Sequence, residues 1–411
     1  MKILLYSINY APELTGIGKY NGELASEFEC RGIQTHVVTA QPYYPEWRRH
    51  KGFANWWTKE LEEDGAIVYR CPLYVPKRAT TLKRLFHLFS FAFSSLLRLA
   101  TLLRLKPDVL FLVQPTLFCA PAALLYCKLT GAKSVMHIQD FEVDVMFGLG
   151  LMINGKAARI AKFIERWLMS HFDAVSTISY SMMENVISKG VGEDQVICFP
   201  NWSDTEFVTP TTDGSRLKAE WGFRPNDKVV LYAGNIGSKQ GLEMLLYAAK
   251  KLTFLPELKF VLVGAGVYAD TLKSMAKEQQ LDNVFFMPLQ PWERVPEMLA
   301  LADIHLVVQK KGVADAMMPS KLTNILSVGG YALVTAEANT ELGSVAERFP
   351  GIYARVEPEN VDAFVTELQG CLNIDTQRTN EVARCYAIEN FNIKTVIDRF
   401  VVDLQRVVTK K

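Results

Sequence analysis

Several features that mark specialised protein classes are missing from this sequence of 411 residues. Its seven cysteines are scattered, and none forms a Cys-x-x-Cys pair, which disfavours a disulfide framework or a zinc site and fits a reducing compartment. The formal net charge is only +1, so we expect no nucleic acid partner. No short repeat or low-complexity tract is present, and 22% charged against 49% hydrophobic residues is the composition of a folded protein.

Long hydrophobic runs are also scarce. The apolar N-terminal run is too short for a signal peptide and is interrupted by Ser7 and Asn9, so it predicts a first buried strand. The stretch from Val109 to Cys127 carries no charge and is long enough to span a bilayer. Its Gln114 and two prolines favour instead a buried strand followed by a helix that starts at a proline; a transmembrane helix is the alternative.

Short Val-, Ile- and Leu-rich runs alternate with longer helical segments, and the pattern restarts after a polar stretch rich in Thr, Gly and Pro. Such alternation is typical of a buried parallel sheet. We therefore predict an α/β protein with two Rossmann-like, doubly wound domains facing across a cleft. The predicted parts are an N-terminal domain (1–205), a linker (206–227), a C-terminal domain (228–390) and a C-terminal helix (391–411).

Ligands of such domains bind outside the carboxyl ends of the strands, which makes the cleft between the domains the expected site. After the first strand, the segment PELTGIGKY places Gly16 and Gly18 before a helix, where backbone amides can approach an anion. It is not a dinucleotide fingerprint, and an ordinary strand–helix turn is the alternative.

Two glycine motifs follow neighbouring strands of the second domain. The segment LYAGNIGSKQGLEML supplies Gly234, Asn235, Lys239 and Gln240, a combination of amides and one cation that suits a diphosphate. It lacks the spacing of an ATP-binding P-loop. The next strand ends in Gly264 and Gly266, for which tight packing of a helix on the sheet is the alternative.

A third motif of the second domain begins a helix. Ser320, Lys321 and Asn324 follow Pro319, and the last two lie one turn apart, so they can face one ligand. A lysine opposes the helix dipole at this end, and an anionic ligand would explain its position. A solvated lysine is the alternative.

The segment SVMHIQDFEVDV ends a predicted strand of the first domain with titratable groups. We take Asp140 and His137 as candidate catalytic residues that orient a sugar or move a proton. His137 lies within the apolar pattern, so a structural histidine is the alternative. Glu142 and Asp144 follow, but the ligand set is not typical of a metal site, and no metal is expected.

Residues 75–106 are basic, aromatic and aliphatic. This composition favours a helix lying in a lipid interface, with its cations reaching the headgroups. The alternative is a buried helix with a basic rim.

Taken together, these segments resemble retaining glycosyltransferases of the GT-B fold, and most of all the colanic-acid-type fucosyltransferases. Across nearly the whole chain the resemblance is carried by segments such as INYAPELTGIGKY, HIQDFEVD, GNIGSKQGLE and MMPSKLTNILSVGG. It implies an acceptor-binding first domain, a donor-binding second domain and a C-terminal helix that returns to the first.

The resemblance also implies roles for individual residues. Gly16 and Gly18 match a glycine loop near the donor phosphates, and Gly264 and Gly266 match glycines near the nucleotide base. Asp140 matches a residue near the donor sugar.

The phosphate-binding lysine of many relatives falls at Gln240, beside Lys239. Two glutamates of the family pattern are replaced by Ala316 and Asn324, which leaves the identity of the donor in doubt.

The implied activity is transfer of a hexosyl group, with GDP-fucose the preferred donor. A transferase that uses a UDP-sugar for O-antigen or capsule synthesis is the alternative. The expected acceptor is a polyprenyl-diphosphate-linked glycan in exopolysaccharide synthesis, at the cytoplasmic face of the membrane. No cofactor or metal is expected. A non-catalytic nucleotide-sugar-binding protein, or a nucleotide-sugar epimerase or dehydrogenase, is the alternative from another class.

Overall fold

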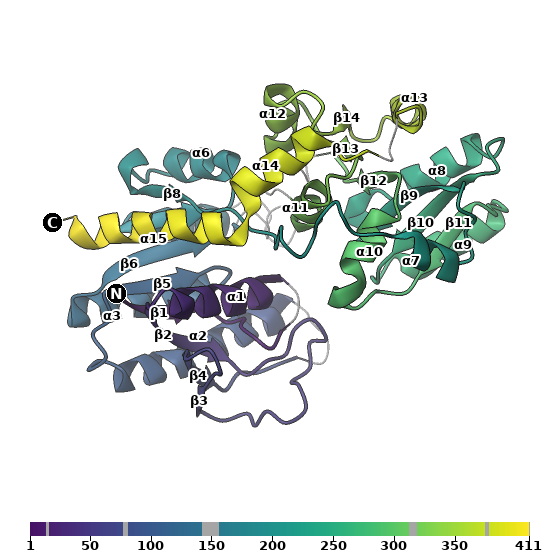
Figure 1. Cartoon of the computed structure of the whole chain (residues 1–411). Helices are drawn as coiled ribbons and strands as arrows, with labels where there is room; N and C mark the ends of the chain where they lie inside the picture. Colours follow the sequence, from purple (N-terminus) through teal and green to yellow (C-terminus); the bar gives the residue numbers. More distant parts are fainter. Residues whose placement is uncertain (14–15, 77–80, 142–155, 312–318, 375–377, 411) are drawn as a thin grey trace. The chain divides into compact units, whose positions relative to one another are not determined.

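The computed structural model describes residues 1–13, 16–76, 81–141, 156–311, 319–374 and 378–410. They divide into two compact units, the first made of Met1–Phe199 and Ile397–Lys411 and the second of Pro200–Val396. Each unit is an α/β domain with helices around a largely parallel sheet, so the predicted fold class is confirmed (Figure 1).

The first sheet has the strand order β3-β4-β2-β1-β5-β6-β7-β8, and only β3 pairs antiparallel with its neighbour. Its strands are β1 (Lys2–Tyr6), β2 (Gln34–Ala40), β3 (Thr58–Leu61), β4 (Ile67–Cys71), β5 (Val109–Val113), β6 (Lys133–Ile138), β7 (Ala174–Thr177) and β8 (Val196–Cys198). Its helices are α1 (Gly16–Cys30), α2 (Thr81–Thr101), η1 (Leu117–Cys119), α3 (Ala120–Thr130), α5 (Lys156–Met169), α6 (Tyr180–Ser188), η2 (Glu193–Gln195) and α15 (Ile393–Thr409).

One hydrophobic cluster joins the first sheet to α2, α3, α5 and α6. It contains Tyr6 from β1, Phe91 from α2, Tyr126 from α3 and Leu168 from α5, all of them buried. These helices therefore cover the same face of the sheet.

The second sheet is parallel throughout, with the order β11-β10-β9-β12-β13-β14. Its strands are β9 (Lys228–Ala233), β10 (Leu258–Val263), β11 (Val284–Met287), β12 (Ile304–Val307), β13 (Ala332–Thr335) and β14 (Ala354–Val356). Its helices are α7 (Ser215–Glu220), η3 (Ser238–Gln240), α8 (Glu243–Lys251), α9 (Ala269–Glu278), η4 (Trp292–Arg294), α10 (Val295–Ala300), α11 (Ser320–Ser327), α12 (Glu341–Arg348), α13 (Val361–Leu372) and α14 (Glu381–Phe391).

Both faces of the second sheet are buried. Val229 and Leu231 of β9 pack into one hydrophobic cluster, while Val230 and Tyr232 pack into another. Successive side chains of a strand point to opposite faces, so a strand buried on both sides reads as a continuous apolar run.

The segment 206–227, predicted as a linker, lies within the second unit. It contains α7, and its Val208 and Leu217 are fully buried in one of the two hydrophobic clusters that cover the second sheet. Its polar composition suggested a connection between domains, but two apolar side chains are enough to fix it to the core.

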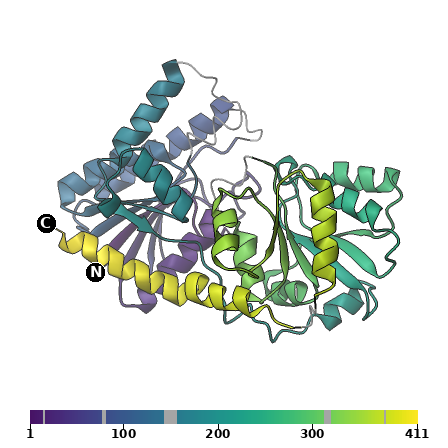
Figure 2. The same cartoon turned by 90° about the horizontal axis from the view of Figure 1, so that it is seen from above.

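The chain re-enters the first unit within α15. Figure 2 shows α15, in yellow, alongside the strands of the first unit. Phe400 of this helix stacks on Phe199, with ring centres 3.8 Å apart, and lies against Phe111 of β5. The stretch Val109–Cys127 forms β5, η1 and most of α3, as the strand-then-helix interpretation predicted. In the described part of the chain, no helix has both the length and the apolar character needed to cross a bilayer.

Candidate functional site

The strand order of the second sheet reverses direction at β9. From β9 the chain proceeds to β10 and β11 on one side, and β12, β13 and β14 follow on the other. Loops that leave the carboxyl ends of neighbouring strands at such a point diverge, and ligands of doubly wound sheets bind there. Gly234 directly follows β9 at this position.

The backbone at Gly234 is in a conformation that favours glycine, with a φ of +153°. A Cβ at this residue would lie 3.8 Å from Nζ of Lys321 and 3.6 Å from the hydroxyl of Tyr232. Glycine is thus favoured here by the backbone conformation, and the side chain of Lys321 from α11 reaches the turn after β9.

Lys321 is held over an aromatic ring. Its Nζ lies 4.1 Å from the ring centre of Tyr232, a cation–π contact. The Tyr232 hydroxyl donates a hydrogen bond of 2.7 Å to the carbonyl of Asn235, which fixes the ring beneath the loop. Burial lowers the pKa of Lys321 to about 7, because the ammonium is removed from water and the described contacts supply no carboxylate.

The glycines after β10 pack on the loop after β9. A Cβ at Gly264 would lie only 1.9 Å from the carbonyl oxygen of Gly234, and one at Gly266 would lie 2.1 Å from that of Ile236. The amide of Ile236 donates to the carbonyl of Ala265 at 2.9 Å. These glycines therefore allow one loop backbone to pack on another, whereas the alternative interpretation had been packing of a helix on the sheet.

A short helical turn, η3, closes the loop after β9. Gln240 accepts a hydrogen bond of 3.1 Å from the amide of Gly237 through its side-chain oxygen. The carbonyl of Lys239 accepts one of 3.0 Å from the amide of Lys310, which ties the loop to the segment after β12. The side chains of Lys239 and Asn235 are exposed.

Asn324 does not share the environment of Lys321. Its side-chain oxygen accepts a hydrogen bond of 2.6 Å from the hydroxyl of Ser203, so it anchors the start of the second unit on α11. Ser320 is the first residue of α11, but its side chain and residues 312–318, including Ala316, lie outside the described part of the chain.

The first sheet has a similar reversal at β1, which lies between β2 and β5. Gly16 begins α1 with a φ of +61°, and a Cβ at Gly18 would lie 2.6 Å from Cβ of Glu13. The sequence interpretation missed Glu13. A carboxylate that directly follows a proline after the first strand was the signal that could have revealed it.

Glu13 is a buried carboxylate that organises two loops. It accepts hydrogen bonds of 3.0 Å from each of the amides of Tyr43 and Tyr44, and one of 2.8 Å from the side chain of Asn9. Burial raises the pKa of Glu13, while these hydrogen-bond donors act in the opposite direction. Glu13 thus connects the loop after β1 to the loop after β2 beside Gly18.

The structure does not support the predicted catalytic role of His137. The side chain is buried, its Nδ1 is 2.9 Å from the hydroxyl of Ser176, and its Nε2 is 2.9 Å from the side-chain nitrogen of Gln139. Phe111 and Phe199 enclose the ring, and burial lowers its pKa to about 3. His137 is therefore a neutral structural residue, the alternative that its apolar surroundings in the sequence allowed.

Asp140 follows β6 by two residues and is half-buried at the carboxyl edge of the first sheet. With Leu117 of η1 and Glu165 of α5 it lines a very small cavity. Glu142 and Asp144 lie outside the described residues.

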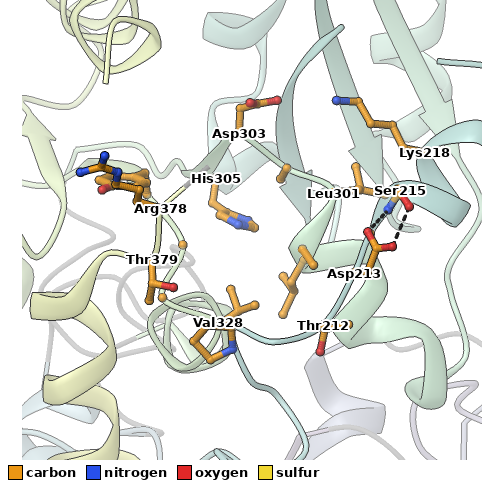
Figure 3. Close-up of a pocket in the computed structure, with 18 of the residues that line it drawn as sticks. Thr212, Asp213, Ser215, Lys218, Leu301, Asp303, His305, Val328, Arg378 and Thr379 are labelled. Atoms are coloured by element: carbon orange, nitrogen blue, oxygen red, sulfur yellow. Dashed lines mark hydrogen bonds between the residues drawn. The ribbon is translucent and has the colours of Figure 1, made fainter. Parts of the chain in front are cut away.

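A larger cavity, of about 380 Å³, lies at the opposite edge of the second sheet (Figure 3). Asp303 and His305, at the amino end of β12, line it together with Lys218 of α7 and Arg378. None of the predicted site residues lines this cavity. The candidate site is therefore the loop cluster around Gly234, Gly264 and Lys321.

Comparison with known proteins tests these expectations. The model of the "Glycosyl transferase 4-like domain" matches residues 15–202, and that of "Glycosyl transferases group 1" matches residues 214–385. The Escherichia coli (strain K12) protein named "Putative colanic acid biosynthesis glycosyl transferase WcaI" is 48% identical over 98% of this chain and 100% of its own. The chain belongs to the glycosyltransferases.

Two more distant matches also cover nearly the full length of both chains. A GDP-mannose-dependent α-(1-6)-phosphatidylinositol monomannoside mannosyltransferase of Mycolicibacterium smegmatis is 24% identical over 96% of this chain and 95% of its own. The crystal structure of Anabaena HepE with UDP superposes with a TM-score of 0.73 at 16% identity, covering 99% of this chain and 100% of that one. The two family models and the relative at 48% identity confirm the predicted family and enzyme class, and the structural superposition confirms the fold.

Proposed function

We propose that this glycosyltransferase transfers a hexosyl group, with retention of configuration, from a nucleotide-diphosphate sugar to a polyprenyl-diphosphate-linked glycan. The process is exopolysaccharide synthesis of the colanic acid type, as supported by the name of the relative that is 48% identical. GDP-fucose is the preferred donor, and a UDP-sugar is the alternative. The observation that carries the proposal is Lys321, held against Gly234 at the point where the second sheet reverses direction.

The chemistry demands stabilisation of the leaving group. Negative charge gathers on the nucleoside diphosphate as the glycosidic bond breaks, and preorganised donors that meet this charge lower the barrier. Lys321 supplies a cation, and the loop around Gly234 supplies backbone amides. No metal or cofactor is part of the proposal.

The reacting sugar becomes oxocarbenium-like, and a phosphate oxygen of the donor accepts the proton of the acceptor hydroxyl. This route needs no nucleophile from the protein. We assign Asp140 to the orientation of the donor sugar, on the basis of its position at the carboxyl edge of the first sheet. Exclusion of water would limit hydrolysis of the donor.

The acceptor is lipid-linked, so the enzyme should act at the inner face of the cytoplasmic membrane. Support comes from α2, within the predicted membrane segment 75–106: its Leu82, Phe86, Phe89 and Phe93 are each more than half exposed. Their spacing of four, three and four residues places them on one outer stripe, while Phe91 of the same helix is buried. A surface helix normally shows polar residues to water, so this stripe marks a contact surface.

A donor screen tests the proposal. Purified protein is heated with GDP-fucose, other GDP-sugars and UDP-sugars, because a ligand that binds the native state raises its melting temperature. The stabilising donor, radiolabelled in the sugar, is then incubated with bacterial membrane lipid extract. Transfer of label into the lipid fraction is expected from GDP-fucose. Tight nucleotide binding without transfer to any acceptor, or turnover of NAD, would refute the assignment.

A further inference from the structure

A second helix of the first unit shows an apolar stripe to solvent. On α5, Ile160, Phe163, Ile164 and Trp167 are exposed, and their spacing of three, one and three residues places them on one face. Leu168 and Met169 of the same helix point into the core. The exposed stripe is therefore separate from the face that holds α5 on the sheet.

The stripes of α2 and α5 belong to the same side of the first unit. Both helices pack into the single hydrophobic cluster on one face of the first sheet. Between them lies η1, which contacts α2 and whose Leu117 lines a small cavity with Glu165 and Met169 of α5. Phe118 of η1 is itself exposed.

The helix that follows η1 adds to the same side. Leu125 and Leu129 of α3 are exposed, and α3 packs against α2. Exposed apolar side chains thus occur on every element of this layer from α2 to α5.

The charge of α2, α3 and α5 is almost entirely positive. The described side chains of α2, α3 and α5 include the cations Lys83, Arg84, Lys128, Arg159, Lys162 and Arg166. Arg98 of α2 packs inward on the ring of Tyr69 and is not part of the surface. The only carboxylate among those side chains is Glu165, which pairs with Lys189 at 2.9 Å and is buried. A surface that combines exposed Phe, Leu and Trp with cations alone complements an anionic lipid surface.

We propose that α5, Phe118 and the outer face of α3 extend the α2 stripe into one broad docking surface for an anionic lipid bilayer. The apolar side chains of both helices enter the boundary between headgroups and acyl chains, and the flanking cations reach lipid phosphates. The proposal rests on the proposed function in one respect: it accepts that α2 meets the membrane. Its new content is that α5 does so as well.

Trp167 allows the contact to be measured directly. Wild-type protein and the variant Trp167→Phe are mixed with vesicles of phosphatidylcholine and phosphatidylglycerol that carry bromine on the acyl chains. The difference between the two emission spectra isolates Trp167 among the seven tryptophans. We expect bromine to quench this difference signal. An unquenched Trp167 on protein that is bound to vesicles would overturn the proposal.

A pair of matched variants measures the contribution to affinity. Phe163→Asp should lower the vesicle partition coefficient by about tenfold or more, since it removes an apolar group and adds a charge repelled by the lipid. The control is Phe254→Asp in the second unit, where the parent side chain is 65% exposed against 68% for Phe163. It should bind vesicles like the wild type.

The outcomes separate this inference from the proposed function. If Phe86→Asp on α2 abolishes vesicle binding while Phe163→Asp does not, α5 is no part of the surface and the membrane role of α2 survives. If the wild type does not bind vesicles at all, both the docking surface that includes α5 and the membrane role of α2 are wrong. If Phe163→Asp instead dissociates a dimer seen by sedimentation in the absence of lipid, the partner is a second copy of this chain and the proposal is wrong.

Discussion

Burial makes the ammonium of Lys321 unfavourable, and a bound diphosphate would supply the negative charge that the described contacts lack. The lysine lies in the first turn of α11, where the helix dipole also opposes a cation. Both effects disfavour the protonated form of Lys321, and a bound anionic ligand would offset both. At the residue scale, this makes the protonation of Lys321 a direct reporter of donor binding.

We expect donor affinity to fall as the pH rises above 7. The donor favours the charged form of Lys321, whose pKa is lowered to about 7, so binding takes up a proton at higher pH. Titration calorimetry from pH 6 to 9 should show this trend. Lys321→Met should bind about 10–100-fold more weakly at pH 6 and lose the trend, because a charged hydrogen bond is removed. Lys277→Met, at an exposed position of α9, is the control.

The stability of the unliganded protein should change with pH in the opposite direction. The unfolded chain holds a proton on Lys321 up to pH of about 10.4, while the folded chain loses it above about 7. Between these limits the unfolded state binds more protons, so the free energy of unfolding should rise with pH relative to Lys321→Met. A pH-independent difference between the two proteins would contradict the lowered pKa.

Asp140 is expected to affect turnover more than binding. Asp140→Asn keeps the shape of the side chain but removes its charge, and a reacting sugar that is no longer held in position can lose about 10²-fold in rate. Donor affinity should change much less. The matched control is Asp194→Asn, which removes an exposed carboxylate of the same unit that pairs with Lys410. Wild-type transfer by Asp140→Asn would remove this residue from the mechanism.

Removing the carboxylate of Glu13 should lower the free energy of unfolding. Glu13→Ala leaves the amides of Tyr43 and Tyr44 without their acceptor, and a buried unsatisfied group costs about 1–3 kcal/mol. Urea unfolding measures the change. Glu23→Ala on α1 removes a half-exposed pair with Lys19 and should cost less than about 1 kcal/mol. Equal effects of the two variants would contradict the role of Glu13.

At the scale of elements, the site depends on how closely the loops after β9 and β10 approach each other. Gly264 contacts the backbone of Gly234, and that contact sets the position of the turn over which Lys321 lies. Both loops follow neighbouring parallel strands, so their ends meet at one edge of the sheet.

We predict that Gly264→Ala weakens both folding and donor binding. The added Cβ would lie 1.9 Å from a carbonyl oxygen, and the forced separation of the loops should destabilise the unit by about 1–3 kcal/mol or more. Thermal unfolding and donor titration measure the two effects. Gly370→Ala in α13, where the new Cβ meets nothing within 4 Å, should be neutral or stabilising by up to about 1 kcal/mol.

At the scale of the whole molecule, the chain closes its first unit with its last helix. One aromatic cluster on a face of the first sheet joins three residues that are far apart in sequence: Phe111, Phe199 and Phe400. The first unit is therefore complete only when α15 is in place.

Phe400→Ala should destabilise the first unit by about 3–5 kcal/mol, the usual effect of removing a buried Phe. Hydrogen exchange should show a greater loss of protection in β5 and β6 than in β9 and β10. Val402→Ala, on the exposed side of α15, should leave exchange unchanged. An equal or larger loss in the second sheet would contradict the assignment of α15 to the first unit.

The sequence by itself determined the elements that are buried on both faces. Runs such as VLFLV and KVVLYA could be assigned to strands because a parallel strand between two helical layers is apolar at every position. The edge strand β3, with the polar sequence TKEL, and the three-residue strands β8 and β14 carry no such signal and were not predicted. The central strands of both sheets and the glycine loops that follow them could thus be derived from local pattern, but these three edge strands could not.

The tertiary structure decided which polar residues meet. Lys321 was a candidate in the sequence, but only the fold places it over Tyr232, 89 residues away, and only the fold separates it from Asn324, which Ser203 engages. The sequence likewise did not indicate that Phe111 and Phe199 enclose His137, or that Glu13 makes buried hydrogen bonds. Such contacts depend on how distant segments pack, and a local sequence pattern does not contain that information.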